Sequence, residues 1–324
     1  MATAVLLREY GGPETLNAEH VDVAAPGPGE LRIRQTAIGV NFHDVYVRGG
    51  LYKTLALPGI PGIEAAGVVE AIGPQVTGFS AGDSIAYITN HYGAYASERI
   101  LPARLAIRLP DGIDQDLAAS VLLKGLTAQM LLRQVHHVQP GDTVLVHAAS
   151  GGVGQLLCQW ASYLGATVIG TVGSEEKAEQ ARAMGCAHTI LYREENFVER
   201  VRQITNDQGV NVVYDSVGKD TFLGSLAALA RRGHLVNFGQ SSGSIDPIEV
   251  SILAPKSNSL TRPGVFHYTA ERAMLESMAS ELFALMERGV LTVQTGQIYP
   301  LADAARAHQT LESRSRMGTL LLKP

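Results

Sequence analysis

The feature that most limits how this chain can fold is a glycine-rich turn between a strand pattern and a helix pattern. Residues 143–149 form an apolar, β-branched run, and apolar residues recur at helical spacing over 153–164. The turn, residues 149–154, reads Ala-Ser-Gly-Gly-Val-Gly, with alanine where the usual motif has its first glycine. In this setting Gly151 lets the backbone approach a pyrophosphate, and Gly154 lets the helix pack on the strand. The sequence therefore predicts that the phosphates of a dinucleotide bind at Ser150, Gly151, Gly152 and Val153.

Strand-like runs and helical patterns alternate on both sides of this turn, from about residue 120 to 238. Further strands are predicted at 167–172, 189–192, 210–214 and 234–238, and helices at 175–184, 197–204 and 222–230. Such alternation is typical of a parallel sheet with helices on both faces. The predicted fold class is therefore α/β, with a doubly wound parallel sheet.

The chain before residue 120 has a different pattern. Short strand-like runs at 31–38, 65–72 and 84–88 are separated by turns rich in Gly and Pro, which favours an irregular, barrel-like β domain. After residue 238 we expect a helix at 270–288 and a strand at 319–322, whereas 246–265 gives no clear pattern. We expect the tail to return to the first domain.

The end of the second predicted strand indicates which dinucleotide binds. NAD sites usually place Asp or Glu there, about 20 residues after the loop, to hold the ribose hydroxyls. Here Gly173 and Ser174 stand instead, and Lys177 follows one helical turn later, within reach of an adenosine 2′-phosphate. Tyr192, after the third strand, can flank the same phosphate. Taken alone, Lys177 would be a solvated lysine and Tyr192 a half-buried core tyrosine, but together these residues predict NADPH.

Composition argues against several other functions. The chain has 324 residues, which suits two domains, and a formal net charge of −5. A mildly acidic chain without a basic aromatic stripe is not typical of nucleic-acid or anionic-membrane binding. No apolar run approaches the ~20 residues that cross a bilayer, and no signal peptide is recognisable. The two cysteines make no disulfide framework. We expect a cytoplasmic protein.

Several motifs spread along the chain form a recognisable set. They are Gly-Val-Asn-Phe-His-Asp-Val-Tyr at 39–46, Pro-Gly-Ile-Glu-Ala-Ala-Gly at 61–67, Lys-Gly-Leu-Thr-Ala at 124–128, the glycine-rich turn with its strand at 141–154, and Arg-Pro at 262–263. Together they resemble the zinc-free NADPH:quinone oxidoreductases, or zeta-crystallin group, of the medium-chain dehydrogenase superfamily. The resemblance implies a Rossmann NADPH-binding domain, residues 124–266, inserted into a β-rich GroES-like catalytic domain, residues 1–123 and 267–324. It also implies a homodimer.

The resemblance further implies roles for particular residues. Tyr46, Tyr52 and Asn41 would be the catalytic residues, with both tyrosines lining the substrate pocket and their hydroxyls bonding a quinone oxygen. Aromatic packing in a loop would explain the two tyrosines equally well. Asn41 and Thr127 would hold the nicotinamide ribose or carboxamide. Phe238, Gly239 and Gln240 are also expected to bind the cofactor, because they follow the fifth strand, and ligands bind at the carboxyl ends of parallel strands. Val265 and Phe266 are expected near the nicotinamide by resemblance alone.

The ligands of a zinc site are missing from the sequence. Alcohol dehydrogenases of this superfamily hold zinc with Cys, His and a further Cys or acidic residue. Asn41 stands where the cysteine is expected and Ile63 where the histidine is expected, so a tetrahedral site cannot assemble. His43 stands alone, and a lone histidine beside a turn is more often hydrogen-bonded locally than bound to a metal. We expect no metal.

Without zinc, the substrate must itself be electrophilic. Quinones meet this need, so the prediction is an NADPH:quinone oxidoreductase that aligns the two reactants and excludes water. The alternative is an NADPH-dependent enone or enal reductase, in which a tyrosine proton donor would matter more. A structural or RNA-binding role, as in some zeta-crystallin-like proteins, is disfavoured by the acidic charge. A polyketide enoyl reductase module is disfavoured because the chain begins and ends at the domain limits.

Overall fold

The computed structural model describes residues 1–313 and 318–324, which divide into two compact units. One unit comprises Met1–Leu123, Glu271–Phe283 and Val293–Pro324, and the other comprises Lys124–Ala270 and Ala284–Thr292. The chain passes from one unit to the other within α2 (Gln115–Gln129), just before α8 (Arg272–Glu287), within α8, and again after Thr292. The catalytic and cofactor-binding roles assigned to residues 1–123 with 267–324 and to 124–266 stay predictions.

The first unit is built on a mainly antiparallel sheet and a separate hairpin. The sheet has the order β14-β15-β3-β4-β5-β7, with β6 also pairing with β3; its strands are β3 (Glu30–Val40), β4 (Glu64–Ile72), β5 (Ser84–Ile88), β6 (Glu98–Pro102), β7 (Ala106–Arg108), β14 (Thr295–Pro300) and β15 (Thr319–Lys323). The hairpin consists of β1 (Ala2–Leu7) and β2 (Leu16–Val21). The short helices of this unit are η1 (Pro13–Thr15), α1 (Phe42–Arg48), η2 (Ala103–Leu105), η5 (Leu301–Asp303) and α9 (Ala304–Glu312).

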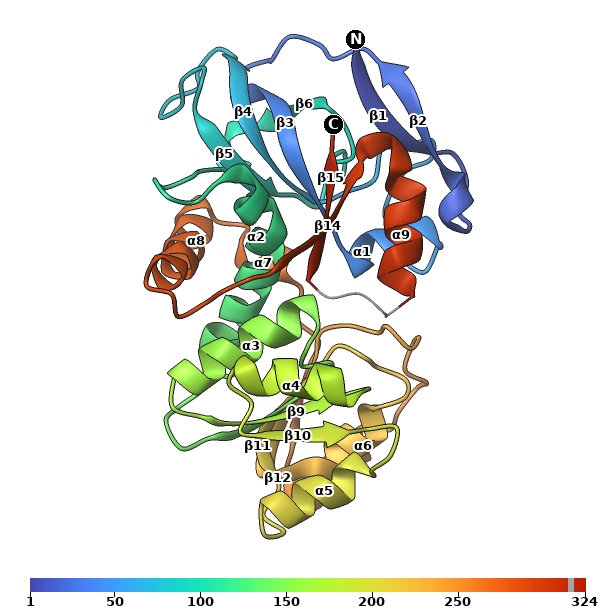
Figure 1. Ribbon diagram of the computed structural model, residues 1–324, viewed down its shortest axis with the longest axis vertical. Coiled ribbons are helices and arrows are strands. Elements are labelled where there is room, and N and C mark those ends of the chain that lie inside the picture. Colours follow the sequence, from blue (N-terminus) through green and yellow to red (C-terminus); the bar gives the residue numbers. More distant parts are fainter. Residues whose placement is uncertain (314–317) are drawn as a thin grey trace. The chain divides into compact units, whose positions relative to one another are not determined.

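The long strand β3 organises this unit because its side chains alternate between core and surface. Leu31 and Ile33 are fully buried, whereas Arg32 and Arg34 between and beyond them form ion pairs with Glu70 of β4. The C-terminal strand β15 pairs antiparallel with the end of β3, beside which it runs in Figure 1. The expectation that the tail returns to the first domain is therefore confirmed.

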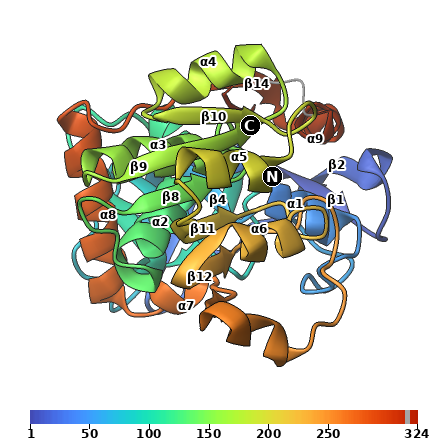
Figure 2. The same ribbon diagram turned by 90° about the horizontal axis from the view of Figure 1, so that it is seen from below.

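The second unit contains a parallel sheet with the order β10-β9-β8-β11-β12-β13, most of which can be followed from top to bottom in Figure 2. Its strands are β8 (Thr143–Val146), β9 (Thr167–Val172), β10 (His188–Leu191), β11 (Val210–Asp215), β12 (Leu229–Asn237) and β13 (Ser259–Thr261). Because β9 and β11 flank β8 on opposite sides, the strand order reverses there. In such sheets, ligands bind at the carboxyl ends of the strands at this reversal.

Helices cover both faces of this sheet, as the doubly wound class requires. They are the π-helix η3 (Met130–Val135), α3 (Gly152–Tyr163), α4 (Glu175–Ala183), α5 (Phe197–Ile204), α6 (Phe222–Ala228), the 3-10 helix η4 (Val250–Lys256) and α7 (Val265–Tyr268). On β11, Val213 packs in the core formed with Phe222 and Leu226 of α6. Its neighbour Tyr214 points to the other face, where its hydroxyl donates to the Leu131 carbonyl of η3 at 3.2 Å.

Several predicted element boundaries were wrong. Strand β8 ends at Val146 rather than at 149, because Ala148 has a φ of 52° that turns the chain out of the strand. Helix α6 ends at Ala228 rather than at 230, and β12 begins at Leu229 rather than at 234. The unassigned segment 246–265 contains η4 and β13 and the first residue of α7.

Candidate active site

The glycine-rich turn follows β8 and leads into α3. The carbonyl of Ala148 accepts a 2.8 Å hydrogen bond from the N–H of Gly151, which closes the turn. A Cβ added at Gly154 would lie 2.2 Å from that same carbonyl oxygen, so only glycine fits there. Gly154 therefore allows the first turn of α3 to lie against the end of the strand.

The residues of this turn suit a diphosphate. Ser150, Gly151, Gly152 and Val153 are all partly exposed, whereas residues 154–158 of the helix behind them are buried. The first N–H groups of a helix have no carbonyl partner within it, and they attract phosphate oxygens. The stem of Lys124 lies against the turn, since a Cβ added at Gly152 would be 3.1 Å from its Cδ. Lys124 was noted in the sequence only as part of a family motif.

The residues predicted to bind an adenosine 2′-phosphate lie together after β9 and β10. Ser174 caps α4, and its Oγ accepts a 3.4 Å hydrogen bond from the N–H of Lys177. The hydroxyl of Tyr192 lies over Gly173, where an added Cβ would come within 2.8 Å of it. Lys177 is half-buried, and Tyr192 is 47% exposed rather than part of the core. Gly173 and Ser174, the two residues after β9, thus carry no carboxylate, and Lys177 follows in the first turn of α4.

The remaining predicted cofactor residues of this unit fall on two neighbouring loops and on α2. Phe238, Gly239 and Gln240 follow β12, and Val265 and Phe266 begin α7 after β13. Because β12 and β13 pair in parallel, both loops follow the carboxyl ends of their strands, on the same side of the sheet. Thr127 lies on α2 and is half-buried.

A residue that sequence reasoning missed holds the two loops together. Arg262, which follows β13, donates from Nη1 to the carbonyl of Gly239 at 3.1 Å and also to Oδ1 of Asn237. The sequence signalled Arg262 only as part of an Arg-Pro motif. Its geometric role depends on strand pairing, which the motif does not reveal.

Buried polar side chains tie together the strand ends beneath these loops. His147 Nδ1 lies 2.9 Å from Thr171 Oγ1, and its Nε2 lies 3.0 Å from Ser225 Oγ. Burial lowers the pKa of His147, so the imidazole carries one proton. Ser225 donates its own proton to Asp215 at 3.1 Å, so His147 Nε2–H donates to Ser225 and Nδ1 accepts from Thr171. Ser225 lies between His147 and Asp215, and all three side chains are buried. This set therefore stabilises the ends of the strands and is not a hydrolytic triad.

In the first unit, Asn41 stands at the start of α1 in a fixed orientation. Its Nδ2 donates to Glu64 Oε2 at 2.9 Å, and its backbone N–H donates to Asp44 Oδ2 at 2.9 Å. Glu64 is fully buried, and its other oxygen accepts from the N–H of Leu123 at 2.7 Å. Because Glu64 holds the amide nitrogen, the side chain of Asn41 keeps one orientation. Glu64 was part of a quoted motif, but its contact with Asn41 was not predicted.

A chain of hydrogen bonds that the sequence did not predict joins α1 to α9. The guanidinium of Arg48 donates to His308 Nδ1 at 3.3 Å. The other ring nitrogen, Nε2, therefore carries the proton and donates to the Tyr95 hydroxyl at 2.9 Å, which donates to Asp44 Oδ2 at 3.2 Å. Burial, reinforced by the charge of Arg48, lowers the pKa of His308 to about 3, so the ring is neutral. Arg48 also forms two 2.9 Å hydrogen bonds with Glu312.

The rings of Tyr46 and Tyr52 lie in contact. Their ring centroids are 5.2 Å apart in an edge-to-face arrangement, and the N–H of Tyr52 donates to the Tyr46 carbonyl at 3.0 Å. His43, three residues before Tyr46 on α1, packs edge-on against Tyr52 with centroids 5.5 Å apart. Its hydrogen-bond partner is Tyr92, at 3.3 Å and 49 residues away, so the expectation of a local partner was wrong.

The positions expected for zinc ligands carry other chemistry. Ile63 is 1% exposed and packs in the core, and Asn41 is bound to Glu64. Within residues 1–313 and 318–324, no three His, Cys, Asp or Glu side chains gather as a set of metal ligands.

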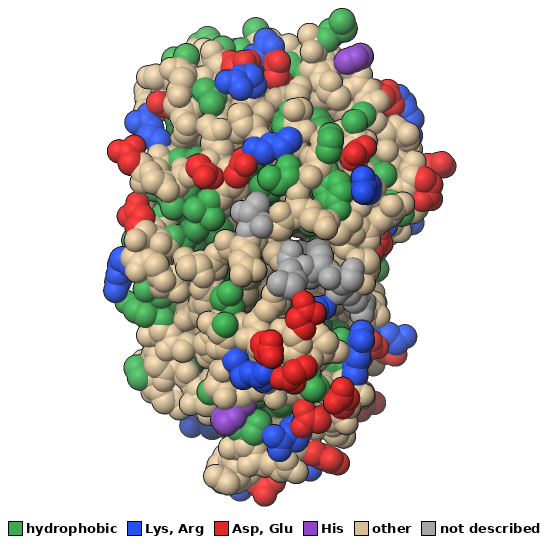
Figure 3. Space-filling view, viewed as in Figure 1, with side chains coloured by type: hydrophobic (Ala, Val, Ile, Leu, Met, Phe, Trp, Pro, Cys, Tyr) green, Lys and Arg blue, Asp and Glu red, His purple; other side chains and the backbone are tan. Residues whose placement is uncertain are grey.

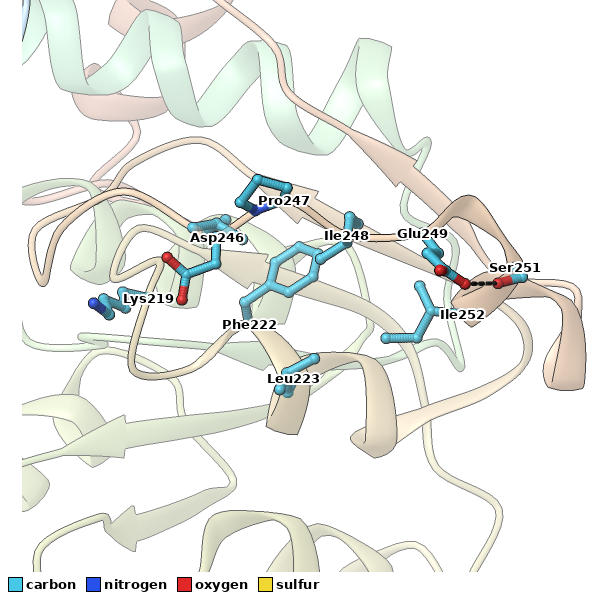
Figure 4. A pocket seen from close by; sticks show the side chains of 10 residues that line it. Lys219, Phe222, Leu223, Asp246, Pro247, Ile248, Glu249, Ser251 and Ile252 are labelled. Atoms are coloured by element: carbon cyan, nitrogen blue, oxygen red, sulfur yellow. Dashed lines mark hydrogen bonds between the residues drawn. The ribbon is translucent and has the colours of Figure 1, made fainter.

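A separate hollow lies in the second unit, with a volume of about 530 Å³. Figure 4 shows it between α6, which carries Phe222 and Leu223, and the segment after β12, which carries Ile248 and Ile252. None of the predicted site residues lines it.

Two protein families match the chain. The family described as the alcohol dehydrogenase GroES-like domain matches residues 27–111, and the family described as zinc-binding dehydrogenase matches residues 152–283. These matches, with the parallel sheet of the second unit, confirm the predicted fold class: a Rossmann-type sheet inserted into a GroES-like domain.

Individual proteins are similar over their full length. The quinone oxidoreductase of Pseudomonas aeruginosa is 47% identical over 100% of both chains. The 2-haloacrylate reductase of a Burkholderia species is 45% identical, covering 100% of this chain and 99% of its own. The crystal structure of Escherichia coli quinone oxidoreductase complexed with NADPH superposes with a TM-score of 0.97 at 45% identity, covering 99% of this chain and 100% of that one.

Proposed function

This chain belongs to the quinone oxidoreductase family of the medium-chain dehydrogenase superfamily, and on that premise we propose that it reduces quinones with NADPH and without zinc. The observation that carries the proposal is full-length similarity to a quinone oxidoreductase together with an open phosphate site. That site combines Gly173, Ser174, Lys177 and Tyr192 and has no carboxylate at the end of β9. It favours a cofactor with a 2′-phosphate.

When bound, NADPH supplies the hydride that a quinone accepts. The turn at 150–153 binds the pyrophosphate, and Lys177 binds the 2′-phosphate. Thr127 holds the nicotinamide end, and in the first unit the amide of Asn41 is fixed by Glu64. The hydroxyls of Tyr46 and Tyr52 bind a quinone oxygen. Because hydride addition followed by one proton converts a quinone to an aromatic hydroquinone, the protein mainly aligns the reactants, and solvent can supply that proton.

A second candidate is reduction of the carbon–carbon double bond of enones or enals. It is favoured by the 45% identity to a 2-haloacrylate reductase over the whole chain. In that reaction the α-carbon must receive a proton, so a tyrosine hydroxyl near the substrate would act as a general acid.

Replacing Tyr52 by Phe distinguishes the two reactions. At saturating concentration the variant should reduce a 1,4-quinone within about twofold of the normal rate, because the ring that forms the pocket wall is kept and the lost hydrogen bond acts on binding. If enal reduction uses Tyr52 as its acid, that rate should fall by ~100-fold. The rates are measured as NADPH oxidation with each acceptor, with Tyr163→Phe as the control. That control removes a hydroxyl that binds Arg288 in the other unit. Equal slowing of both reactions by Tyr52→Phe would contradict the assignment.

Independence from zinc is part of the proposal. It is supported by Asn41 and Ile63 at the expected ligand positions and by the 2.9 Å hydrogen bond that occupies the Asn41 amide. The match to the family described as zinc-binding dehydrogenase begins at residue 152, beyond both positions.

We also propose that the protein is a homodimer. Strand β13 is an edge strand of the parallel sheet. Exposed apolar side chains line the hollow of Figure 4 or lie near β13 in the sequence: Leu223, Ile248, Val250, Ile252 and Leu260. Exposed apolar groups beside a sheet edge favour burial by a second copy.

Val250→Asp should therefore convert the dimer to a monomer, because Val250 is 79% exposed and its replacement disturbs no core. Light scattering coupled to gel filtration measures the mass. Met274→Asp, at an exposed apolar residue of α8, is the control and should leave the mass unchanged. A dimer that persists in the Val250 variant would exclude this surface as the interface.

The proposed location is the cytoplasm, and no nucleic acid is a proposed partner. Cys158 and Cys186 are free thiols with sulfur atoms 3.2 Å apart, which fits a reducing compartment. None of the described helices is long and apolar enough to cross a bilayer. On the face drawn in Figure 3, basic and acidic side chains are intermixed, and no purely basic area extends across it.

A further inference from the structure

Tyr92 has an unusual backbone conformation close to the proposed substrate residues. Its φ is 57°, in the left-handed region that bulky residues rarely adopt. Such a conformation is strained and persists only where surrounding contacts hold it. The side chain is nonetheless 6% exposed, so the chain turns in this way while burying an aromatic ring.

Two polar contacts and one ring contact hold Tyr92. Its hydroxyl forms a short hydrogen bond with Thr54 Oγ1 and lies 3.3 Å from His43 Nε2. The rings of His43 and Tyr92 stack with centroids 6.0 Å apart and planes 28° apart. Thr54 comes from the loop after α1, and His43 comes from α1 itself. Tyr92 thus connects α1 to the loop that follows it.

His43 contacts Tyr52 as well as Tyr92. Its ring packs against Tyr52 with centroids 5.5 Å apart, while Tyr46 packs against the same ring with centroids 5.2 Å apart. Tyr52 therefore contacts His43 and Tyr46, which are three residues apart on one face of α1. Thr54 lies two residues after Tyr52, so its bond to Tyr92 also restrains the loop that carries Tyr52.

We propose that Tyr92, His43 and Thr54 are positioning residues that fix the ring of Tyr52 against the quinone. The inference rests on the proposed function, in which Tyr52 contacts substrate. Tyr92 anchors the set through its two hydrogen bonds, and His43 transmits the constraint by ring packing. Their effect is on how well the quinone binds, because none of the three is assigned to the cofactor.

Burial supports this role for His43. Desolvation lowers the pKa of His43 to about 4, so the ring is neutral at physiological pH and packs as an aromatic group. The rings that contact it are those of Tyr52 and Tyr92, and burial raises the pKa of the Tyr92 phenol.

The experiment compares Tyr92→Phe with Tyr214→Phe in the intact protein, using a 1,4-quinone as acceptor. Both substitutions remove one hydroxyl from a buried ring, but Tyr214 hydrogen-bonds the Leu131 carbonyl in the other unit. Tyr92→Phe should raise the KM for quinone by about fivefold, the equivalent of one lost hydrogen bond, and leave kcat within about twofold. The Kd for NADPH, measured by fluorescence titration, should not change in either variant.

Two further variants separate positioning from a general loss of stability. Thr54→Val removes the same hydrogen bond at an exposed position and should reproduce the rise in KM. In a Tyr52→Ala background, Tyr92→Phe should have no further effect on KM, because the ring it positions is gone.

An unchanged KM in Tyr92→Phe, or the same rise in KM with and without the Tyr52 ring, would overturn the positioning role while leaving quinone reduction intact. If the unaltered protein binds NADPH but does not reduce quinone, the proposed function fails, and this role fails with it.

Discussion

Replacing Lys177 by Ala should weaken NADPH binding by about 10–100-fold, the effect of losing one charge-assisted contact with a phosphate. Lys177 is half-buried in the first turn of α4, beside Gly173 and the hydroxyl of Tyr192. No carboxylate stands at the end of β9 to bind ribose hydroxyls instead. The affinity is measured by fluorescence titration of the cofactor, at fixed ionic strength because screening changes the size of the effect.

NADH is the internal control for this prediction. It lacks the 2′-phosphate, so its affinity should change by less than about twofold in the same variant. Lys177→Arg keeps the charge and should restore most of the NADPH affinity. Equal losses for NADPH and NADH would mean that Lys177 supports α4 rather than the phosphate, and the choice of NADPH would then lose its physical basis.

Replacing Arg48 by Met should lower the free energy of unfolding by about 3 kcal/mol, because it removes a buried guanidinium together with its ion pair and its hydrogen bonds. The guanidinium is 5% exposed and bonds to Glu312, to His308 and, at 3.1 Å, to the carbonyl of Gly11. Methionine fills similar space, so the loss should come from the polar contacts. Urea unfolding measures the change.

Arg8→Met is the matched control. Arg8 also forms two hydrogen bonds with a glutamate, Glu19, but its side chain is 59% exposed, so its loss should change the free energy of unfolding little. Arg48→Met should also weaken quinone turnover, because α1 carries both His43 and Tyr46. Similar unfolding free energies for the two variants would show that the chain from Glu312 to Asp44 contributes little to stability.

The regular parts of the fold could be predicted because their signals are local. Strand β9 (Thr167–Val172) and helix α5 (Phe197–Ile204) have the predicted bounds, since β9 is a short continuous run rich in β-branched residues and the apolar residues of α5 recur at helical spacing. The glycine-rich turn was recognisable because Gly154 meets a carbonyl oxygen that leaves no room for a Cβ. Strand β13 was missed because it is short and half-exposed, and Ser257 just before it adopts a left-handed conformation that breaks any periodicity.

The contacts that support the site could not be predicted because their partners are far apart in the chain. Asp44 and Tyr95 are separated by 51 residues, and Tyr95 and His308 by 213. No motif or period connects such positions in a single sequence. Family resemblance named Asn41, Tyr46 and Tyr52, but the residues that fix them, Glu64 and His43, became evident only from the folded chain.

The proposed reaction of this protein is hydride transfer from NADPH to quinones without a metal. Its most direct test is the initial rate of NADPH oxidation by purified protein treated with a strong chelator, with a simple 1,4-quinone and an enal assayed in parallel. We predict rapid quinone reduction at a rate that added Zn²⁺ does not increase. Metal-free quinone reduction would be contradicted if chelation abolished the activity and added Zn²⁺ restored it. It would also be contradicted if only the enal were reduced.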